Sequence, residues 1–243
     1  MITALILSGG TGTRLGLDIP KQYIEVNGRP IISYCIETII KCKKIDAVRI
    51  VAAGEWRDFI VEWLERYDVD KKFRGFSNPG ENRQLSIFNG LCDIRKCGPE
   101  VRFVGNSHDC PDDNYVLVHD AARPLLTPEL LERCLDGAVG HDGAMPVLPM
   151  KDTVYSSCDG KTVSGLLKRS EIYAGQAPEV FLLGKYYEAN LKLMPERIHS
   201  INGSAEPAIL AGMDVAMIPG DEGNYKITTA ADLERFKEIV KVT

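Results

Sequence analysis

The sequence predicts an α/β fold with a mostly parallel central sheet and helices on both of its faces. Three observations lead to this expectation: short apolar segments alternate with segments of helical periodicity, polar and glycine-rich loops follow the apolar segments, and the chain is long enough for a large core. The 243 residues are 44% hydrophobic and 26% charged, which excludes a disordered chain and a small disulfide-bonded scaffold. We expect a single domain over residues 1–243.

The first 150 residues carry most of the predicted strands and helices. Strands are recognised as short apolar runs bounded by loop residues, and helices by apolar residues that recur every three or four positions. In the expected helix Pro30–Lys41, for example, Ile32, Cys35 and Ile39 fall on one face. In chain order the expected elements are strand Thr3–Leu7, helix Pro30–Lys41, strand Ala47–Ala52, helix Trp56–Arg66, helix Asn82–Asp93, strand Tyr115–His119, helix Pro128–Leu135 and strand Ala144–Val147.

Residues 148–175 interrupt this alternation and are expected to form a projecting β-hairpin arm. The dipeptide Asp159-Gly160, within the turn Cys158–Lys161, lies between two short β-like runs, and Asp-Gly is typical of a hairpin turn. A projecting hairpin buries little of its own surface. Two interpretations remain open: a surface excursion without a partner, or an arm that pairs with a second subunit.

Charge and cysteine usage limit the class of ligand. The net charge is -5, from 29 Lys and Arg against 34 Asp and Glu, which disfavours non-specific binding to nucleic acid. We find no run of about 20 apolar residues that could cross a bilayer and no secretory leader. Seven cysteines at irregular spacing, without a CxxC pair, favour buried thiols in a reducing compartment over a metal site. We expect a cytoplasmic protein with small-molecule ligands.

The segment Ser8–Gly16, SGGTGTRLG, is a glycine loop after the first expected strand. Glycines let successive backbone N–H groups approach an anion closely, so the loop suits a triphosphate. It lacks the GK[ST] of a Walker A loop, and Leu15 stands where a dinucleotide fingerprint has its third glycine. A glycine-rich turn without any ligand is the alternative interpretation of the glycines alone.

Two cations accompany the glycine loop. Arg14 lies within it, and Lys21 follows in the tripeptide Pro20-Lys21-Gln22. A guanidinium fork and a mobile ammonium group beside one phosphate cradle suit a reaction whose transition state gains negative charge. Lys21 alone could be a solvated surface lysine, but the combination GGTGTRLGxxxPKQ is far more specific than its parts.

This combination resembles the nucleotidyltransferases that join a nucleoside triphosphate to a sugar or polyol phosphate. More narrowly, the whole chain resembles the cytidylyltransferases acting on 2-C-methyl-D-erythritol 4-phosphate and on D-ribitol 5-phosphate. Besides the glycine loop, the segments that carry the resemblance are Pro79–Ser86, Val118–Pro124, Met150–Thr153 with Lys168 and Arg169, and Gly223–Thr229. The resemblance implies a Rossmann-like nucleotidyltransferase sheet and a homodimer formed through the 148–175 arm.

The resemblance also implies a role for individual residues. The acceptor phosphate would attack the α-phosphorus of CTP and expel pyrophosphate, with Mg²⁺ or another divalent cation held by Asp120. The implied catalytic residues are Arg14, Lys21, Arg169 and Lys226. The implied nucleotide-binding residues are Ser8, Gly9, Gly10, Thr11, Gly12, Gly80, Arg83, Ser86, Asp120 and Ala121. The implied acceptor-binding residues are Asp120, Arg123, Thr153, Arg169 and Lys226.

Simpler structural roles stay open for some of these segments. Asn82 or Glu81 could cap the helix that follows, and Thr228, Thr229 and Asp232 look like the capped start of a last helix. Asp120 could form only a surface pair with an arginine, and His119 is expected to be structural. Residues 148–175 could likewise lack any partner.

Two segments depart from the family pattern, and both lie on the acceptor side. Ala177 stands where members often carry a threonine, and residues 202–206 differ from the usual stretch. The acceptor could therefore be another polyol phosphate or a phosphonate. A different class, an NAD(P)-binding oxidoreductase, is disfavoured by the missing loop glycine, and a catalytically silent nucleotide-binding module is disfavoured by the presence of Arg14 and Lys21.

Overall fold

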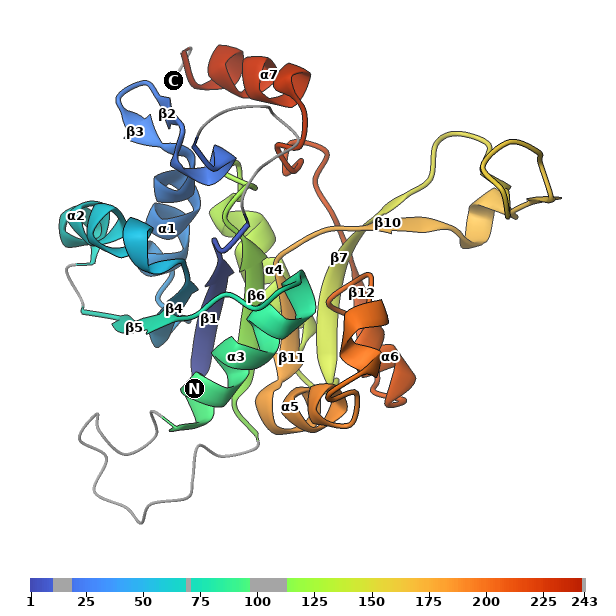
Figure 1. Cartoon of the computed structure of the whole chain (residues 1–243), viewed down its shortest axis with the longest axis horizontal. Coiled ribbons are helices and arrows are strands. Elements are labelled where there is room, and N and C mark those ends of the chain that lie inside the picture. The colour runs from blue at the N-terminus through green and yellow to red at the C-terminus, as the bar shows by residue number, and fades with distance from the viewer. Residues whose placement is uncertain (11–18, 69–70, 97–112, 242–243) are drawn as a thin grey trace.

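The computed structural model describes residues 1–10, 19–68, 71–96 and 113–241, and its centre is one mixed β-sheet (Figure 1). Strands follow the order β10-β7-β11-β6-β1-β4-β5, and β12 pairs with β7. The pairs β1–β4, β1–β6, β4–β5 and β7–β12 are parallel, whereas β11 is antiparallel to both β6 and β7. The strands of this sheet are β1 (Ile2–Leu7), β4 (Ala47–Val51), β5 (Phe73–Ser77), β6 (Tyr115–Asp120), β7 (Gly143–Pro149), β10 (Tyr173–Gly175), β11 (Glu179–Leu182) and β12 (Val215–Pro219).

Helices cover both faces of the sheet, which explains why β4 and most of β6 are buried along their length. The helices α1 (Ile31–Lys41), α2 (Arg57–Tyr67) and α4 (Pro128–Gly137) contribute to one core cluster. The helices α3 (Arg83–Lys96), α5 (Leu183–Leu191) and α6 (Glu206–Leu210) contribute to the core on the opposite face. None of the helices in the described part of the chain is long and apolar enough to span a membrane.

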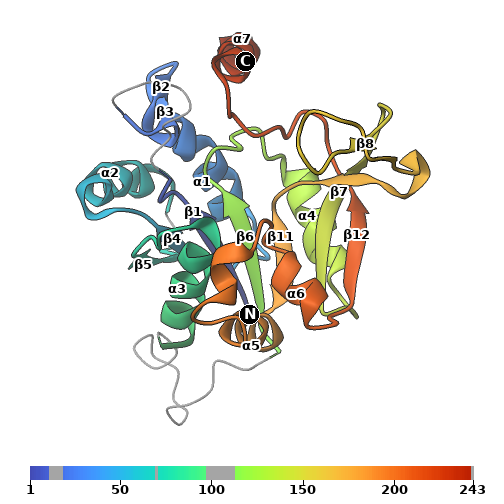
Figure 2. The same ribbon diagram turned by 45° about the vertical axis from the view of Figure 1, so that its right-hand side comes forward.

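The last helix, α7 (Ala230–Lys241), does not lie on the sheet. Its Leu233 and Phe236 pack with Ile31 at the start of α1 and with Val26 of a small ladder formed by β2 (Glu25–Val26) and β3 (Arg29–Pro30). Figure 2 shows α7 at the top of the molecule, beyond the end of the sheet.

The starts of α3 and α7 follow the capping chemistry that their sequences predict. The Asn82 side chain accepts the N–H of Leu85 at the start of α3, so Asn82 rather than the exposed Glu81 caps this helix. At the start of α7, Asp232 accepts the N–H groups of Thr228 and Thr229, as expected from the sequence. These caps fix the loops that lead into both helices, and both loops belong to predicted binding segments.

The eight predicted elements are present, with ends that differ by at most three residues. Local sequence patterns did not predict β2, β3, β5, β10, β11, α5, α6 or β12, because these are short or carry a polar residue where a strand pattern expects an apolar one. The largest topological consequence is β11, an antiparallel strand inserted between β6 and β7. The alternation of strand and helix patterns predicted parallel strand pairs. An antiparallel strand between β6 and β7 requires a reversal of chain direction, and the sequence before β11 contains no strong turn signal that would indicate one.

The 148–175 arm begins and ends in the sheet, where β10 pairs with β7, and the segment between these strands projects away from the sheet in Figures 1 and 2. It contains the expected hairpin, in which β8 (Tyr155–Ser156) pairs antiparallel with β9 (Gly165–Leu166). The Cys158–Lys161 turn prediction was too short, because the connecting loop runs over residues 157–164. Within it, Asp159 accepts the N–H groups of Lys161 and Thr162, so the side chain organises a longer loop than Asp-Gly alone would form.

The cysteine prediction is confirmed in part. Cys35 and Cys134 are buried in the core, and burial raises the pKa of both thiols to about 12. Cys158, in contrast, is exposed on the arm, so the prediction that the thiols are buried is wrong for this residue. Cys97 and Cys110 lie outside the described residues.

Candidate functional site

The candidate site lies where the carboxyl ends of β1, β4 and β6 meet. Ser8 N–H donates to Val51 O at 2.8 Å, and Ala121 N–H donates to Leu7 O at 3.0 Å, so three strand ends are joined side by side. Ligands of open α/β sheets bind at such an edge because the loops after the strands converge there. The sequence places its three most informative loops, which follow β1, β5 and β6, at this edge.

Two predicted nucleotide-binding loops touch one another at this edge. Gly9 lies so close to the loop after β5 that a Cβ atom there would come within 2.5 Å of Pro79 Cβ. A Cβ on Gly80 would come within 2.3 Å of Leu85 Cβ, and Gly80 N–H donates to Ser86 Oγ at 3.0 Å. These contacts require glycine at both positions and give Ser86 a structural task. The predicted residues Thr11, Gly12 and Arg14 lie outside the described part of the chain.

Lys21 and Ala121 have defined places beside these loops. Lys21 is half-buried and begins a short 3-10 helix, η2 (Lys21–Tyr23), that follows the glycine loop. Ala121 is buried in the core, and its N–H is engaged by Leu7. The structure therefore places Ala121 at the floor of the site.

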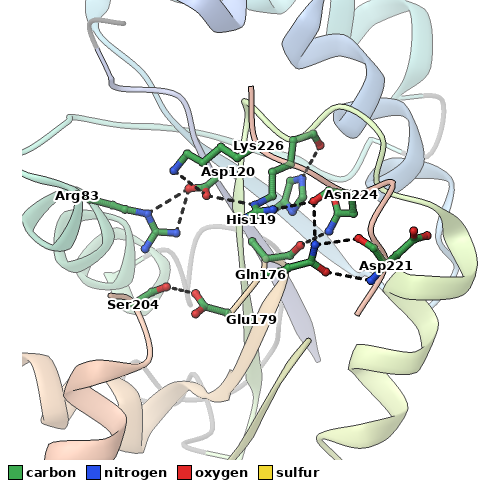
Figure 3. Close-up of polar contacts among 11 residues, drawn as sticks. Arg83, His119, Asp120, Gln176, Glu179, Ser204, Asp221, Asn224 and Lys226 are labelled. Carbon is green, nitrogen blue, oxygen red and sulfur yellow. Dashed lines mark hydrogen bonds and ion pairs between the residues drawn. The ribbon is translucent and has the colours of Figure 1, made fainter. Parts of the chain in front are cut away.

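The strand-end cluster, defined as Asp120 with Arg83, Arg123 and Lys226, forms the centre of the site (Figure 3). Arg83 donates to Asp120 Oδ1 through Nε at 3.1 Å and through an Nη atom at 3.0 Å. Lys226 Nζ lies 3.0 Å from Asp120 Oδ2, and Arg123 Nε lies 3.7 Å from the same oxygen. Residues that the sequence scatters over more than 140 positions thus share one carboxylate.

Charge in the strand-end cluster is unbalanced, because three cations surround one carboxylate. Burial alone would raise the pKa of Asp120, but Arg83, Lys226 and Arg123 together hold it well below its usual range. Burial lowers the pKa of Arg123, whereas for Arg83 the neighbouring carboxylates outweigh burial and raise the pKa. The side chains of Arg83 and Lys226 are each about one-third exposed, so both can meet an anion from solution. The sequence alternative of a surface Asp–Arg pair is wrong, since the Asp120 side chain is 10% exposed.

A network of amide and carbonyl groups holds Arg123 and Lys226 in place. Arg123 donates to the carbonyl of Asn224 at 2.7 Å, and the buried Asn224 side chain donates to Ala177 O at 2.6 Å. Gln176 donates to Asp221 O at 2.8 Å and accepts the N–H of Asp221 at 3.0 Å. The loop that carries Lys226 is therefore tied to the segment between β10 and β11, as Figure 3 shows.

His119 has the structural role that the sequence analysis expects. Its ring is completely buried, and Nε2 lies 3.1 Å from Arg123 O, a carbonyl that can only accept a hydrogen bond. Burial lowers the pKa of His119 to about 4, so the ring is neutral at physiological pH. The ring supports the Asp120–Arg123 turn and offers no base to the site.

Glu179 and Ser204 lie beside the strand-end cluster and were not identified from the sequence. Glu179 is opposite Val118 on the neighbouring strand, which places its side chain on the same sheet face as Asp120. Ser204 donates a hydrogen bond to the Glu179 carboxylate, and both residues are buried. Burial raises the pKa of Glu179 to about 7. The available signal was a glutamate at the start of the apolar run Glu179–Leu182, two residues after Ala177.

The predicted arm residues do not join the strand-end cluster within one chain. Arg169 donates to Lys151 O at 3.1 Å and lines an open hollow with Met150, Lys168 and Tyr173. Thr153 is exposed between β7 and β8. No hydrogen bond or ion pair among the described residues connects either side chain to Asp120.

A divalent cation fits this site only in company with a phosphorylated ligand. No group of three or more His, Cys, Asp or Glu side chains that could hold a metal ion occurs within residues 1–10, 19–68, 71–96 and 113–241. Asp120 offers a single carboxylate, and its two oxygens already contact cations. Magnesium is commonly held by one or two carboxylates together with substrate phosphates, so this donor set suits a cation that arrives with a nucleotide.

Comparison with known proteins supports one family over the whole chain. A family model described as 2-C-methyl-D-erythritol 4-phosphate cytidylyltransferase matches residues 2–242. A protein of that name from Rubrobacter xylanophilus is 35% identical over 231 residues, covering 95% of this chain and 90% of the relative. A ribitol-5-phosphate cytidylyltransferase from Vibrio parahaemolyticus is 31% identical over 241 residues, covering 99% and 96%.

Solved structures agree with this assignment. A 4-diphosphocytidyl-2C-methyl-D-erythritol synthase from Anaerococcus prevotii matches with a TM-score of 0.79 and 25% identity, covering 99% of this chain and 96% of that one. The Francisella tularensis 2-C-methyl-D-erythritol 4-phosphate cytidylyltransferase matches with a TM-score of 0.76 at 23% identity, which supports the fold. Together with the match along residues 2–242, these similarities show that the chain belongs to the 2-C-methyl-D-erythritol 4-phosphate cytidylyltransferase family.

Proposed function

We propose that this protein transfers the cytidylyl group of CTP to a phosphorylated polyol and releases pyrophosphate. The candidate acceptors are 2-C-methyl-D-erythritol 4-phosphate and D-ribitol 5-phosphate, the substrates that the names of its relatives contain. The observation that carries the proposal is the strand-end cluster, in which three cations converge beside a glycine loop. Such an excess of positive charge suits two phosphorylated reactants that repel one another.

In the proposed reaction, an oxygen of the acceptor phosphate attacks the α-phosphorus of CTP. A bond forms between these atoms while the bond to the β-phosphate oxygen breaks, and pyrophosphate leaves with the electron pair. A phosphate monoester is largely ionised at neutral pH, so the nucleophile requires no general base. This agrees with the state of His119 beside the cluster, whose ring is buried, neutral and hydrogen-bonded to a backbone carbonyl.

The side chains divide between the two reactants in this proposal. Ser8, Gly9, Gly10, Gly80, Arg83 and Ser86 form the nucleotide side, with Lys21 and the undescribed Arg14 neutralising the triphosphate. Arg123 and Lys226 hold the acceptor phosphate. Asp120 would hold a divalent cation together with phosphate oxygens, and the cation would neutralise charge on the triphosphate. Arg83 would then exchange its bond to Asp120 for a bond to the nucleotide.

The acceptor side is completed by the arm of a second subunit in our proposal. Tyr155, Val163 and Leu166 expose large apolar side chains along the arm, a pattern that favours burial against another chain. Arg169 and Thr153 would reach the strand-end cluster of the partner. The homodimer, the single-domain organisation and the cytoplasmic location stay predictions.

The test is a panel of acceptors incubated with CTP and Mg²⁺, with pyrophosphate release and the CDP-linked product measured. The panel contains both candidate polyol phosphates, a phosphonate and a sugar phosphate. The proposal expects release with one polyol phosphate and none with CTP alone. Absence of release with every acceptor of the panel, from a folded protein, would refute it.

A further inference from the structure

Gln22 makes contacts with the glycine loop that the proposed reaction does not yet use. Its side chain is 3% exposed, and its amide Nε2 donates to Ser8 O at 2.8 Å and to Gly10 O at 2.7 Å. A side-chain amide has two N–H groups, so these two bonds use its full donor capacity. One buried side chain therefore spans the beginning of the loop.

Tyr23, the next residue of η2, adds a second attachment to the same loop. Its hydroxyl donates to Ser8 O at 3.0 Å and accepts from Ser8 Oγ at 2.8 Å. The Tyr23 ring stacks on Trp56 with 4.2 Å between ring centroids and meets the edge of Phe59 at 6.0 Å. The Gln22–Tyr23 pair thus connects the glycine loop to the segment that begins α2.

This arrangement determines which way the loop backbone faces. The Ser8 carbonyl points toward the Gln22–Tyr23 pair, and in a planar trans peptide the N–H of Gly9 points in the opposite direction. Gly9 also lies against Pro79, which limits movement toward the neighbouring loop. Loss of the Gln22 amide would remove this donor from the Gly10 carbonyl and would leave the Ser8 carbonyl with the Tyr23 hydroxyl alone, so the backbone at Gly10 would be less restrained.

Lys21 is covalently coupled to the same pair as the first residue of η2. Tyr23 N–H donates to Pro20 O at 2.9 Å, and Ile24 N–H donates to Lys21 O at 3.2 Å, which closes the short helix. Three successive residues thus combine one cation with two attachments to the loop. Any shift of η2 relative to Ser8 would move the Lys21 backbone by a similar amount.

We propose that Gln22 is a positioning residue for nucleotidyl transfer: its amide, spanning Ser8 and Gly10, fixes the first part of the glycine loop, Ser8–Gly10, relative to Lys21. The inference rests on the proposed function and adds a residue that acts through Lys21. The important feature is the rigid link between the loop and the Lys21 cation. A misplacement of a reacting group by about 1 Å can lower the rate roughly 10²-fold. Gln22 itself does not touch the reacting atoms.

The experiment is a double-mutant cycle with Gln22→Met, Lys21→Ala and the combined variant. Methionine keeps the volume of glutamine but donates no hydrogen bond. We expect Gln22→Met to lower kcat by about 10- to 100-fold, and the combined variant to be no worse than Lys21→Ala within about threefold. If one residue acts through the other, the fold-losses in kcat of the two single variants do not multiply in the combined variant. If the two residues act independently, the fold-losses multiply.

Lys72→Met is the matched control. Lys72 is also buried and also donates to two backbone carbonyls, those of Ile40 and Cys42 at 2.8 Å each, but these lie at the opposite end of the sheet strands. We expect this variant to lose thermal stability comparably to Gln22→Met and to keep its kcat within about twofold.

CTP binding to the same variants, measured by titration calorimetry, separates this inference from the proposed function. We expect Gln22→Met to weaken CTP binding by about tenfold and Lys72→Met to leave it unchanged. A wild-type protein without acceptor turnover would refute the proposed function, while the binding result would still decide on Gln22. Multiplicative losses in the cycle, or CTP binding by folded Gln22→Met at wild-type strength, would overturn the inference.

Discussion

The strand-end cluster and the 148–175 arm both present cations, but the surrounding structure treats them differently. In the cluster, Arg83, Arg123 and Lys226 share a nearly buried carboxylate that lies at the end of a core strand. On the arm, Lys168 pairs with Glu171 at the surface, where both side chains are mostly exposed. The sheet positions the cluster, whereas the Lys168–Glu171 pair lies within one short exposed segment of the arm.

This difference indicates which part of the site, the nucleotide side or the acceptor side, a single chain can form. Tertiary packing brings the cluster together from three segments of the chain and concentrates positive charge there. On the arm, Arg169 lines an open hollow and several apolar side chains are exposed, so they do not pack against the rest of the chain. The nucleotide side should therefore be complete in a monomer, whereas the acceptor side should depend on assembly.

The largest effect is expected for Asp120→Asn, which keeps the shape of the side chain and removes its charge. The three cations then repel one another without the Asp120 carboxylate between them, so we expect kcat to fall by about 10²–10³-fold and the fold to lose several kcal/mol of stability. Pyrophosphate release at varied Mg²⁺ concentration and chemical unfolding measure the two effects. Asp136→Asn, which alters an exposed pair with Lys44, is the control. Turnover within about twofold of wild type would show that Asp120 has no role in the reaction.

Arg169→Ala tests whether the arm acts on its own chain or on a partner. We expect kcat/KM for the acceptor to fall by about 10- to 100-fold while CTP binding stays unchanged. Subunits carrying Arg169→Ala are then mixed and refolded with subunits carrying Lys226→Met. If the arm acts on the partner, each mixed dimer has one intact site, so about a quarter of the wild-type activity returns. No recovery in verified mixed dimers would show that the arm acts within its own chain.

Glu179→Gln sharpens the electrostatic side of the comparison. The folded-state pKa of about 7 lies above the ordinary value of 4.5, so the folded protein binds this proton more tightly. The stabilising contribution of the protonated carboxyl is full below about pH 4.5 and is lost as the pH rises to about 7. Glutamine is neutral throughout and can still accept from Ser204.

Relative to wild type, Glu179→Gln should therefore gain stability between pH 5 and pH 8, on the order of 1–3 kcal/mol. Urea unfolding of both proteins across this range measures the difference, and comparison at each pH removes the contributions of other groups such as His119. A stability difference independent of pH would contradict the raised pKa of Glu179.

The smallest effect is expected on the arm itself. Lys168→Ala removes an exposed pair with Glu171, and such pairs contribute little because water screens them and both side chains lose freedom. We expect Tm to change by less than about 2 °C. A much larger drop would mean that the arm is organised as firmly as the cluster and that the contrast between the two regions is wrong.

Much of this account could be predicted from the sequence, because its strongest signals are local. The apolar patterns of α1 and of the strand that ends at Asp120 predicted these core elements. Asn82 and Asp232 indicated where their helices begin. Resemblance named Arg83, Arg123 and Lys226, although only folding shows that they share one carboxylate. The cluster depends on contacts between residues far apart in sequence, which no local pattern reports.

Other features could not be predicted because tertiary structure decides them. Glu179 reads as an ordinary charged residue, yet β11 carries it into the interior beside Asp120. Gln22 lies in the recognised tripeptide Pro20-Lys21-Gln22, but no role could be predicted for it, because its hydrogen-bond partners are backbone carbonyls of another segment. The arm loop was expected to be a tight turn, but the Asp159 side chain organises a longer one.

The most direct test of the central claim compares Lys226→Met with Lys237→Met in acceptor-dependent pyrophosphate release. Lys226 belongs to the strand-end cluster, whereas Lys237 forms a surface pair with Glu234 on α7. We predict that Lys226→Met loses about 10²–10³-fold in kcat/KM for the acceptor and retains CTP binding, while Lys237→Met matches wild type. Equal activity of the two variants would contradict the claim that converging cations at the strand ends hold the reacting phosphates.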